Sequence, residues 1–205
     1  MNTQIVHIND PHALEIARAV LLTGGLVAFP TDTVYGLGCL LRDSKAIDRL
    51  YQVKERSQSK AIAVLIGDVS DLQQLTVSVP PLAASLAQHF WPGALTLIFP
   101  IHPDLPPNLS PFPTIGIRMP DHAFARELLR LMGPLATTSA NISGQESPVS
   151  AEEVADQLNG RIELILDGGK TPGGIPSTVV DCTTPEPRIL RAGALSAETL
   201  GLISA

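Results

Sequence analysis

Hydrophobic residues recur along this chain in two patterns, which predict helices and strands in turn. Apolar positions at mostly helical spacing follow Asp10-Pro11, a capping carboxylate with a proline suited to the first helical turn, and Gly24-Gly25 ends that segment. Further helices are expected at about residues 44–54, 82–90, 121–132, 150–158 and 196–201.

Short apolar runs between these helices predict strands. The run at 61–66 (AIAVLI) is continuously apolar, which is typical of a strand covered on both faces. Helices and strands interleave without strict alternation, so we predict an α/β (α+β) fold, a twisted mixed β-sheet flanked by helices. We expect one domain over residues 1–205, with a core of about 10–195. The predicted strands are 26–29, 61–66, 94–99, 114–119, 134–139, 162–167, 177–182 and 188–193.

The charge balance limits the kind of ligand. The chain of 205 residues has 14 Lys and Arg against 20 Asp and Glu, a net charge of −6, and only 4% aromatic residues. A dedicated nucleic-acid binder usually has a basic surface, and single-strand binders use aromatic stacking. A local cationic concave site in an acidic body therefore suits a small anion better than a long polyanion.

Other sequence features favour a cytoplasmic location. Cys39 and Cys182 are isolated, which indicates a reducing compartment, and the N-terminal segment lacks the pattern of a signal peptide. No apolar run approaches the length of a membrane span, so we expect no membrane partner. The five histidines lack metal-ligand spacing, and no protein metal ligand is predicted.

A polar turn follows the first predicted strand. The segment FPTDTVYGLG (29–38) places Thr31, Asp32 and Thr33 where a strand ends. In open α/β sheets, ligands gather outside the carboxyl ends of strands. The alternative is a structural turn in which Asp32 is a cap and the glycines serve backbone conformation.

A run of cations follows the second predicted helix. Lys54, Arg56 and Lys60 lie at the helix exit and in the polar loop before the next strand. Each charge-assisted hydrogen bond to phosphate is worth about 1.5–3 kcal/mol, so several together would bind a nucleotide. A solvated basic helix end is the alternative and explains Lys54 well.

Arginines and hydroxyls end or begin other strands. Arg118 and Arg191 each lie at the end of a mostly apolar strand, and two such arginines favour convergence on an anion. Thr114 opens its strand and is either a ligand contact or a strand former. Ser139-Ala140-Asn141 follows a strand with small and polar groups suited to close backbone approach, although a serine-rich turn would look the same.

One segment resembles a phosphate-binding loop without being one. Residues 167–171 (DGGKT) imitate the end of that motif, but residue 164 is leucine where its first glycine belongs. Pro172 and Pro176 forbid the helix that would have to follow. We therefore predict a flexible loop, with Ser177 at the start of the next strand.

These motifs together resemble the L-threonylcarbamoyladenylate synthase family, the YrdC-like domain, over about residues 14–193. FPTDTVYGLG, the Lys-x-Arg of 54–56, WPGALTLIF, IGIRMPDH, SANISG, STVVD and ILRAG occur in the family's order. The resemblance implies a YrdC/RibB-like fold and a nucleotidyltransferase that converts ATP, L-threonine and bicarbonate to threonylcarbamoyl-AMP, pyrophosphate and water. The adenylate would then supply the tRNA threonylcarbamoyl transferase machinery. ATP is implied as a substrate, with Mg²⁺ expected beside it.

The resemblance also implies residue roles. Lys54 and Arg56 would be catalytic, and Thr33, Arg118 and Ser177 would bind threonine. Contacts to ATP would come from Lys54, Arg56, Lys60, Thr114, Ser139, Asn141 and Arg191. The chain departs from the family at Ser57, where proline is frequent, and at Ala61, where proline or glycine is common. From the sequence as given, we expect no additional carboxyl-terminal domain of the kind that longer members have.

Two other functions stay open at this point. The domain could be a YrdC-like RNA-binding module without catalysis, reading RNA shape through the cationic concavity. It could also form a carbamoyl-adenylate from another substrate than threonine. Weak RNA binding beside the synthase activity is a further possibility.

Overall fold

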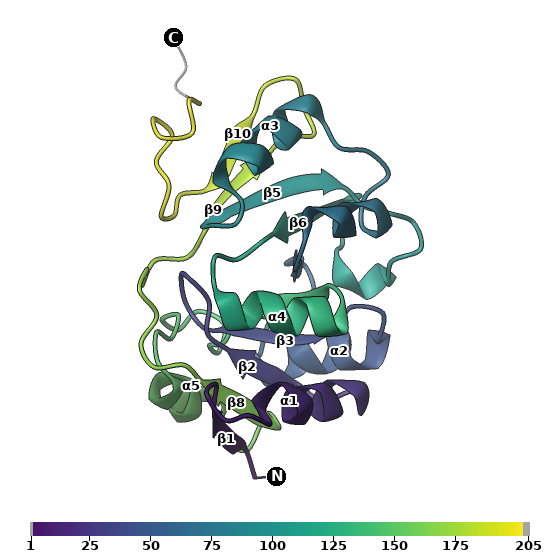
Figure 1. Cartoon of the computed structure of the whole chain (residues 1–205). Helices are drawn as coiled ribbons and strands as arrows, with labels where there is room; N and C mark the ends of the chain where they lie inside the picture. Colours follow the sequence, from purple (N-terminus) through teal and green to yellow (C-terminus); the bar gives the residue numbers. More distant parts are fainter. Residues whose placement is uncertain (1, 203–205) are drawn as a thin grey trace.

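The computed structural model describes residues 2–202, and one mixed sheet runs through them (Figure 1). Its ten strands lie in the order β1-β8-β2-β3-β7-β4-β6-β5-β9-β10, which leaves β1 and β10 at opposite ends. The strands are β1 (Gln4–His7), β2 (Val27–Phe29), β3 (Gly36–Leu40), β4 (Ala63–Leu65), β5 (Leu95–Pro100), β6 (Thr114–Arg118), β7 (Leu135–Ser139), β8 (Leu164–Asp167), β9 (Thr178–Asp181) and β10 (Arg188–Arg191).

Helices pack on both faces of this sheet. They are α1 (Ala13–Leu22), α2 (Ser44–Val53), α3 (Pro81–Phe90), α4 (Ala123–Met132) and α5 (Ala151–Leu158), with short 3-10 turns at Val69–Gln74 and Pro107–Leu109. Parallel and antiparallel strand pairs both occur: β4 is parallel to β6 and antiparallel to β7. The predicted mixed sheet flanked by helices is thus confirmed.

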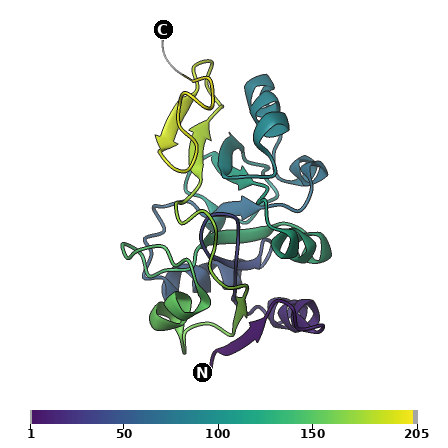
Figure 2. The ribbon, with the colours of Figure 1, turned by 60° about the vertical axis from the view of Figure 1, so that its left-hand side comes forward.

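Strand alternation divides the core into two clusters. In β2, Ala28 faces the larger cluster, which includes residues of α2, α3 and α5, whereas Val27 and Phe29 face the smaller one with α1 and α4. Helices α1 and α4 lie together on one side of the molecule in Figure 2, away from α5. Beyond α4, the sheet face that carries α1 and α4 is open.

One predicted element was wrong and two strands were missed. Residues 196–201 form a turn instead of a helix, because Ser196 bonds to the backbone N–H of Thr199 and Gly201 adopts a φ of +66° after a single turn. Strand β3 was not predicted, since its glycines at 36 and 38 weaken the strand signal. Strand β1 was also not predicted, because an edge strand with polar residues at both ends lacks a long apolar run.

Candidate functional site

A cavity of about 300 Å³ lies on the open part of the sheet face, within the size range of small-molecule sites. The registers of β7, β4 and β6 place Thr137, Ala63 and Gly116 side by side across this face, and Gly36 of β3 lies opposite Ser139 in the same lining. All five residues are small. These small residues form the floor of the cavity and leave open space above the sheet. The longer arginine side chains and the hydroxyl groups surround this space.

Among residues 2–202, three arginines and no carboxylate line the cavity. The guanidinium groups belong to Arg56, Arg118 and Arg191, which come from the loop after α2, from the end of β6 and from the end of β10. Burial and then the positive charge of Arg56 lower the pKa of Arg191, so the cations are close enough to repel one another. A ligand with negative charge would relieve this repulsion.

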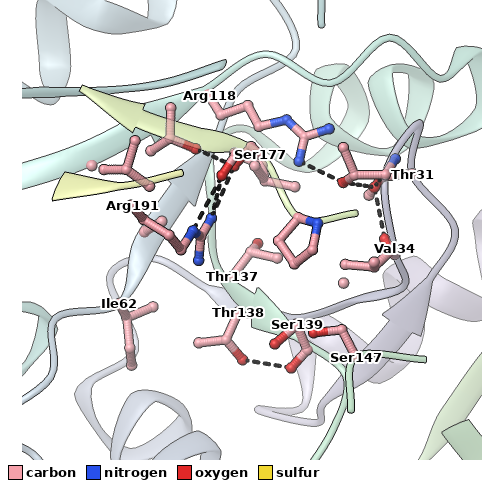
Figure 3. A pocket seen from close by; sticks show the side chains of 18 of the residues that line it. Thr31, Val34, Ile62, Arg118, Thr137, Thr138, Ser139, Ser147, Ser177 and Arg191 are labelled. Carbon is pink, nitrogen blue, oxygen red and sulfur yellow. Dashed lines mark hydrogen bonds between the residues drawn. The ribbon is translucent and has the colours of Figure 1, made fainter. Parts of the chain in front are cut away.

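Arg118 is fixed in the cavity wall and is only 6% exposed. Its Nη1 donates to Thr33 Oγ1 at 2.8 Å (Figure 3). Its Nε donates to the Gly93 carbonyl at 3.0 Å, and its Nη2 pairs with Asp32. Burial lowers the pKa of Arg118 and Asp32 opposes that shift. Asp32 is therefore an ion-pair partner rather than a cap of its own turn, and two guanidinium N–H groups remain for a ligand.

Ser177 links the second arginine to the sheet. Arg191 Nη2 donates to the Ser177 carbonyl at 2.8 Å and to its Oγ at 3.1 Å, and that Oγ lies 2.7 Å from Thr96 Oγ1 (Figure 3). Gly193 is required beside them, because a Cβ there would lie 2.4 Å from the Pro176 carbonyl oxygen. Thr33 and Arg118 thus form one wall of the cavity, and Ser177 and Arg191 form the neighbouring wall.

Arg56 reaches the cavity from a loop tied back to the fold. Its Nη2 donates to the Ala61 carbonyl at 2.8 Å, while its Nε is buried without a partner among the described residues. The Tyr51 hydroxyl donates to the Lys60 carbonyl at 2.9 Å and closes the same loop. Arg56 therefore carries an unsatisfied buried donor at the cavity wall, where polar groups are normally hydrogen-bonded.

Lys54 has a different place from its neighbour. It is 1% exposed, and its Nζ donates to the carbonyls of Ser139 and Asn141 instead of lining the cavity. Burial and then Arg56 lower the pKa of Lys54 to about 7, while the two carbonyl bonds favour the ammonium and oppose that shift. Lys54 therefore fixes the segment 139–141 from behind.

The Ser-Ala-Asn segment is internally bonded. Ser139 Oγ donates to Asn141 Oδ1 at 2.5 Å, and Asn141 Nδ2 donates to the carbonyls of Ile142 and Gln145 at 2.8 and 2.9 Å. Ser139 lines the cavity, whereas Asn141 is buried behind it. The role of Asn141 in this geometry is to orient Ser139.

Of the residues predicted for the site, six line one cavity and four do not. Thr33, Arg56, Arg118, Ser139, Ser177 and Arg191 are brought together, while Lys54, Asn141, Lys60 and Thr114 lie outside the lining. Lys60 is exposed in the turn of residues 57–60, and Thr114 lies two residues from Gly116 on the same face of β6. Ala63, Thr96, Gly116 and Thr137 also line the cavity and were not predicted as site residues, although alternation within their predicted strands would have placed them on one face.

The segment between β8 and β9 runs beside the cavity and contributes Pro176 and Ser177 to its lining. These strands lie far apart in the sheet order, and residues 168–177 connect them along one side of the molecule (Figure 1). The Tyr35 hydroxyl donates to the Gly169 carbonyl at 2.7 Å, and Gly174 N–H donates to the Thr33 carbonyl at 2.9 Å. The segment is therefore attached to the same turn that carries Thr33.

Comparison with known proteins identifies the class. Residues 19–193 match the Sua5/YciO/YrdC family model, described as "Telomere recombination". The chain is 44% identical to threonylcarbamoyl-AMP synthase of Bacillus subtilis, covering 97% of this chain and 58% of that protein. It is 41% identical to the Pyrococcus abyssi synthase (91% and 56% covered) and 40% identical to the human one (93% and 71%).

Solved structures agree with this assignment. The structure of P. abyssi Sua5 complexed with L-threonine matches with a TM-score of 0.92 and 40% identity, over 96% of this chain and 59% of that one. Escherichia coli YciO matches with a TM-score of 0.86 and 29% identity, over 97% and 99%. The chain belongs to the Sua5/YciO/YrdC family, as predicted. It spans little more than half the length of the Bacillus and Pyrococcus synthases.

Proposed function

We propose that this chain is an L-threonylcarbamoyladenylate synthase, which converts ATP, L-threonine and bicarbonate to threonylcarbamoyl-AMP, pyrophosphate and water. The observation that carries the proposal is the cavity with three arginines and no carboxylate in a protein of net charge −6. The names of the relatives support the same substrates. The product would feed the modification of tRNA, through a threonylcarbamoyl transferase machinery, in the cytoplasm.

The two walls of the cavity suit the two organic substrates. Arg118, with Thr33 and Ser177 beside it, offers free N–H donors and hydroxyls to the carboxylate and side-chain hydroxyl of threonine. Arg56 and Arg191 would face the phosphates, with Ser139 at the nucleotide. Lys60 and Thr114 would join these contacts at the open end of the cavity, Lys60 by reorienting its exposed side chain.

The chemistry asks for positioning and charge neutralisation more than for covalent help. The amine of threonine and bicarbonate give a carbamate and water, and a carbamate oxygen attacks the α-phosphorus of ATP as pyrophosphate leaves. Fixed guanidinium groups stabilise the negative charge that develops on the phosphoryl oxygens and on the leaving group. Lys54 would act through the segment 139–141, which its ammonium holds in place.

The cavity lining does not form a Mg²⁺ site. No carboxylate lines it, and residues 2–202 contain no cluster of three His, Cys, Asp or Glu side chains that could hold a metal ion. A Mg²⁺ ion would therefore enter with the nucleotide, held by phosphate oxygens and water.

Within residues 2–202, none of the helices combines the length and the apolar character that a membrane span needs.

Replacing one arginine tests the proposal. Arg56→Ala should lower the rate of pyrophosphate release by about 10²–10³, the range for loss of one preorganised donor. The assay measures pyrophosphate in the presence of ATP, bicarbonate and L-threonine. Lys45→Ala removes a cation from the exposed first turn of α2, at its other end, and is the matched control.

Three outcomes would contradict the proposal in different ways. A near-normal rate in Arg56→Ala would refute the role of Arg56. Continued turnover without L-threonine would make threonine the wrong substrate and favour a different carbamoyl-adenylate. Steeply salt-dependent RNA binding without threonine-dependent turnover would favour an RNA-binding module instead.

A further inference from the structure

Helix α2 ends in a left-handed turn built on a glutamate. The N–H of Arg56 donates to the Tyr51 carbonyl at 3.0 Å, and the N–H of Glu55 donates to the Gln52 carbonyl at 3.1 Å. These two bonds define a Schellman motif, in which the residue after the C-cap is usually glycine. Glu55 occupies that place with a φ of +52°, and within residues 2–202 it is the single non-glycine residue with positive φ.

This turn separates two neighbouring cations. On one side, Lys54 points back into the fold, where its Nζ meets the carbonyls of Ser139 and Asn141 and its own carbonyl accepts from Ser143 N–H at 2.8 Å. On the other side, Arg56 enters the cavity. If the helix continued through these residues, its regular rotation would fix the directions of the Lys54 and Arg56 side chains. The left-handed residue between them therefore sets where the two side chains point.

Arg161, in the connection between α5 and β8, holds the turn from outside. Its Nη1 lies 2.7 Å from Glu55 Oε1 and 3.3 Å from the Val53 carbonyl, one of the carbonyls left free at the helix end. Both side chains of this pair are largely exposed, and such pairs contribute little by themselves. The backbone conformation of Glu55 is therefore the main feature, and Arg161 supports it.

We propose that Glu55 is a positioning residue: its left-handed backbone, supported by Arg161, places Lys54 behind the Ser139–Asn141 segment and Arg56 in the phosphate part of the cavity. The proposal rests on the proposed function insofar as it assigns nucleotide phosphates to Arg56. Left-handed conformations of non-glycine residues are uncommon and cluster at functional sites. The side chain of Glu55 itself touches no substrate in this assignment.

A series at this one position tests the proposal. Glu55→Gly accepts the left-handed conformation and should bind ATP within about twofold of the unaltered protein, whereas Glu55→Val disfavours it and should raise the Kd for ATP about tenfold, or 1.4 kcal/mol. Arg161→Ala should fall between them. Glu127→Val makes the same chemical change on the exposed face of α4 and is the control. ATP affinity is measured by titration calorimetry.

Amide hydrogen exchange of Ser143 gives a second readout that needs no ligand. Exchange should be faster in Glu55→Val than in Glu55→Gly, because the Ser143 N–H bonds to the Lys54 carbonyl. Equal ATP affinity and equal Ser143 exchange in the valine and glycine variants would overturn the proposal. Loss of ATP binding in both would also overturn it, because the carboxylate would then be what matters. An unaltered protein that binds no ATP would refute the proposed function, and the exchange rates would still decide about the turn.

Discussion

One face of the sheet has a covered half and an open half, and the difference between them lies in residue size at neighbouring positions. In β7, Leu135 packs in the cluster with α1 and α4, while Thr137, two residues further on the same face, forms the cavity floor. In β4, Leu65 lies at the boundary and Ala63 belongs to the floor. A change from leucine to alanine or threonine over two residues ends the core and begins the site.

The halves are also stabilised by different interactions. Phe29, Leu128 and Leu164 in the covered half are fully buried among apolar side chains, where hydrophobic burial dominates. In the open half, Arg118 is nearly as buried but depends on ion pairing and hydrogen bonds, and so does Lys54, which lies behind the Ser139–Asn141 segment. The open half thus keeps its polar groups ordered before a ligand arrives, which is what preorganised catalysis requires.

Of the changes that would make the open half resemble the covered half, a larger side chain in the cavity floor should have the largest effect on turnover. A Cβ on Gly116 would lie 3.1 Å from Thr96 Cγ2 and 3.4 Å from Ile98 Cδ1, so Gly116→Val would place a branched side chain where the ligand belongs. We expect turnover to fall by about 100-fold, or about 2.7 kcal/mol. Overpacking should lower the free energy of unfolding by about 1–3 kcal/mol. Pyrophosphate release and urea unfolding measure the two effects.

The control for this variant is the next residue in β6, which faces the other side. Ile117 is fully buried in the larger core cluster. Ile117→Val should cost about 0.5–1.5 kcal/mol of stability and leave turnover within about twofold. Normal turnover in Gly116→Val would mean that the cavity floor does not limit the ligand.

Sequence patterns predicted the strands whose apolar runs are long. The runs at β5 and β6 were clear, because alternate apolar residues there bury against the larger cluster. Strand β3 was missed because its two glycines weaken the strand signal, and one of them, Gly36, also lines the cavity. The glycine that leaves space for the cavity thus also makes this strand hard to recognise in the sequence.

The site was predictable in its charges and less so in its shape. Arg118 and Arg191 stand at strand ends in the sequence, and the family resemblance added their roles. The internal bonds of Lys54 could not be predicted, because its acceptors lie 85 and 87 residues away in the chain. The pairing of Arg118 with Asp32 likewise depends on how two distant strand ends meet.

A smaller effect is expected in the pH dependence of the free energy of unfolding. The pKa of Lys54 is about 7 in the fold, against an ordinary value of 10.5. Between these values the unfolded chain binds a proton that the folded protein lacks, so the free energy of unfolding should rise with pH by up to about 1.4 kcal/mol per unit. Below pH 7 both states are protonated and this dependence ends.

The measurement compares buried residues from the two halves. Lys54→Met should lose the rise between pH 7 and 10 in urea unfolding. Leu128→Ala, from the covered half, should lower the free energy of unfolding by about 2–5 kcal/mol, and this loss should be the same at every pH. If the wild-type and Lys54→Met stabilities run parallel from pH 7 to 10, the lysine keeps its ordinary pKa in the fold.

The smallest effect is expected at the segment that runs beside the cavity. Lys170 resembles the lysine of a phosphate-binding loop, but it is exposed and does not line the cavity. The segment is attached through its backbone instead: a Cβ on Gly173 would lie 2.5 Å from the Asp32 carbonyl oxygen. Lys170→Ala should therefore change the free energy of unfolding by less than about 0.5 kcal/mol and leave turnover nearly unchanged.

Gly173→Ala, the comparison variant, should displace the segment and lower turnover. A loss in Lys170→Ala as large as that in Arg56→Ala would mean that the segment itself binds phosphate, and the open half would then have a second source of positive charge beside the cavity.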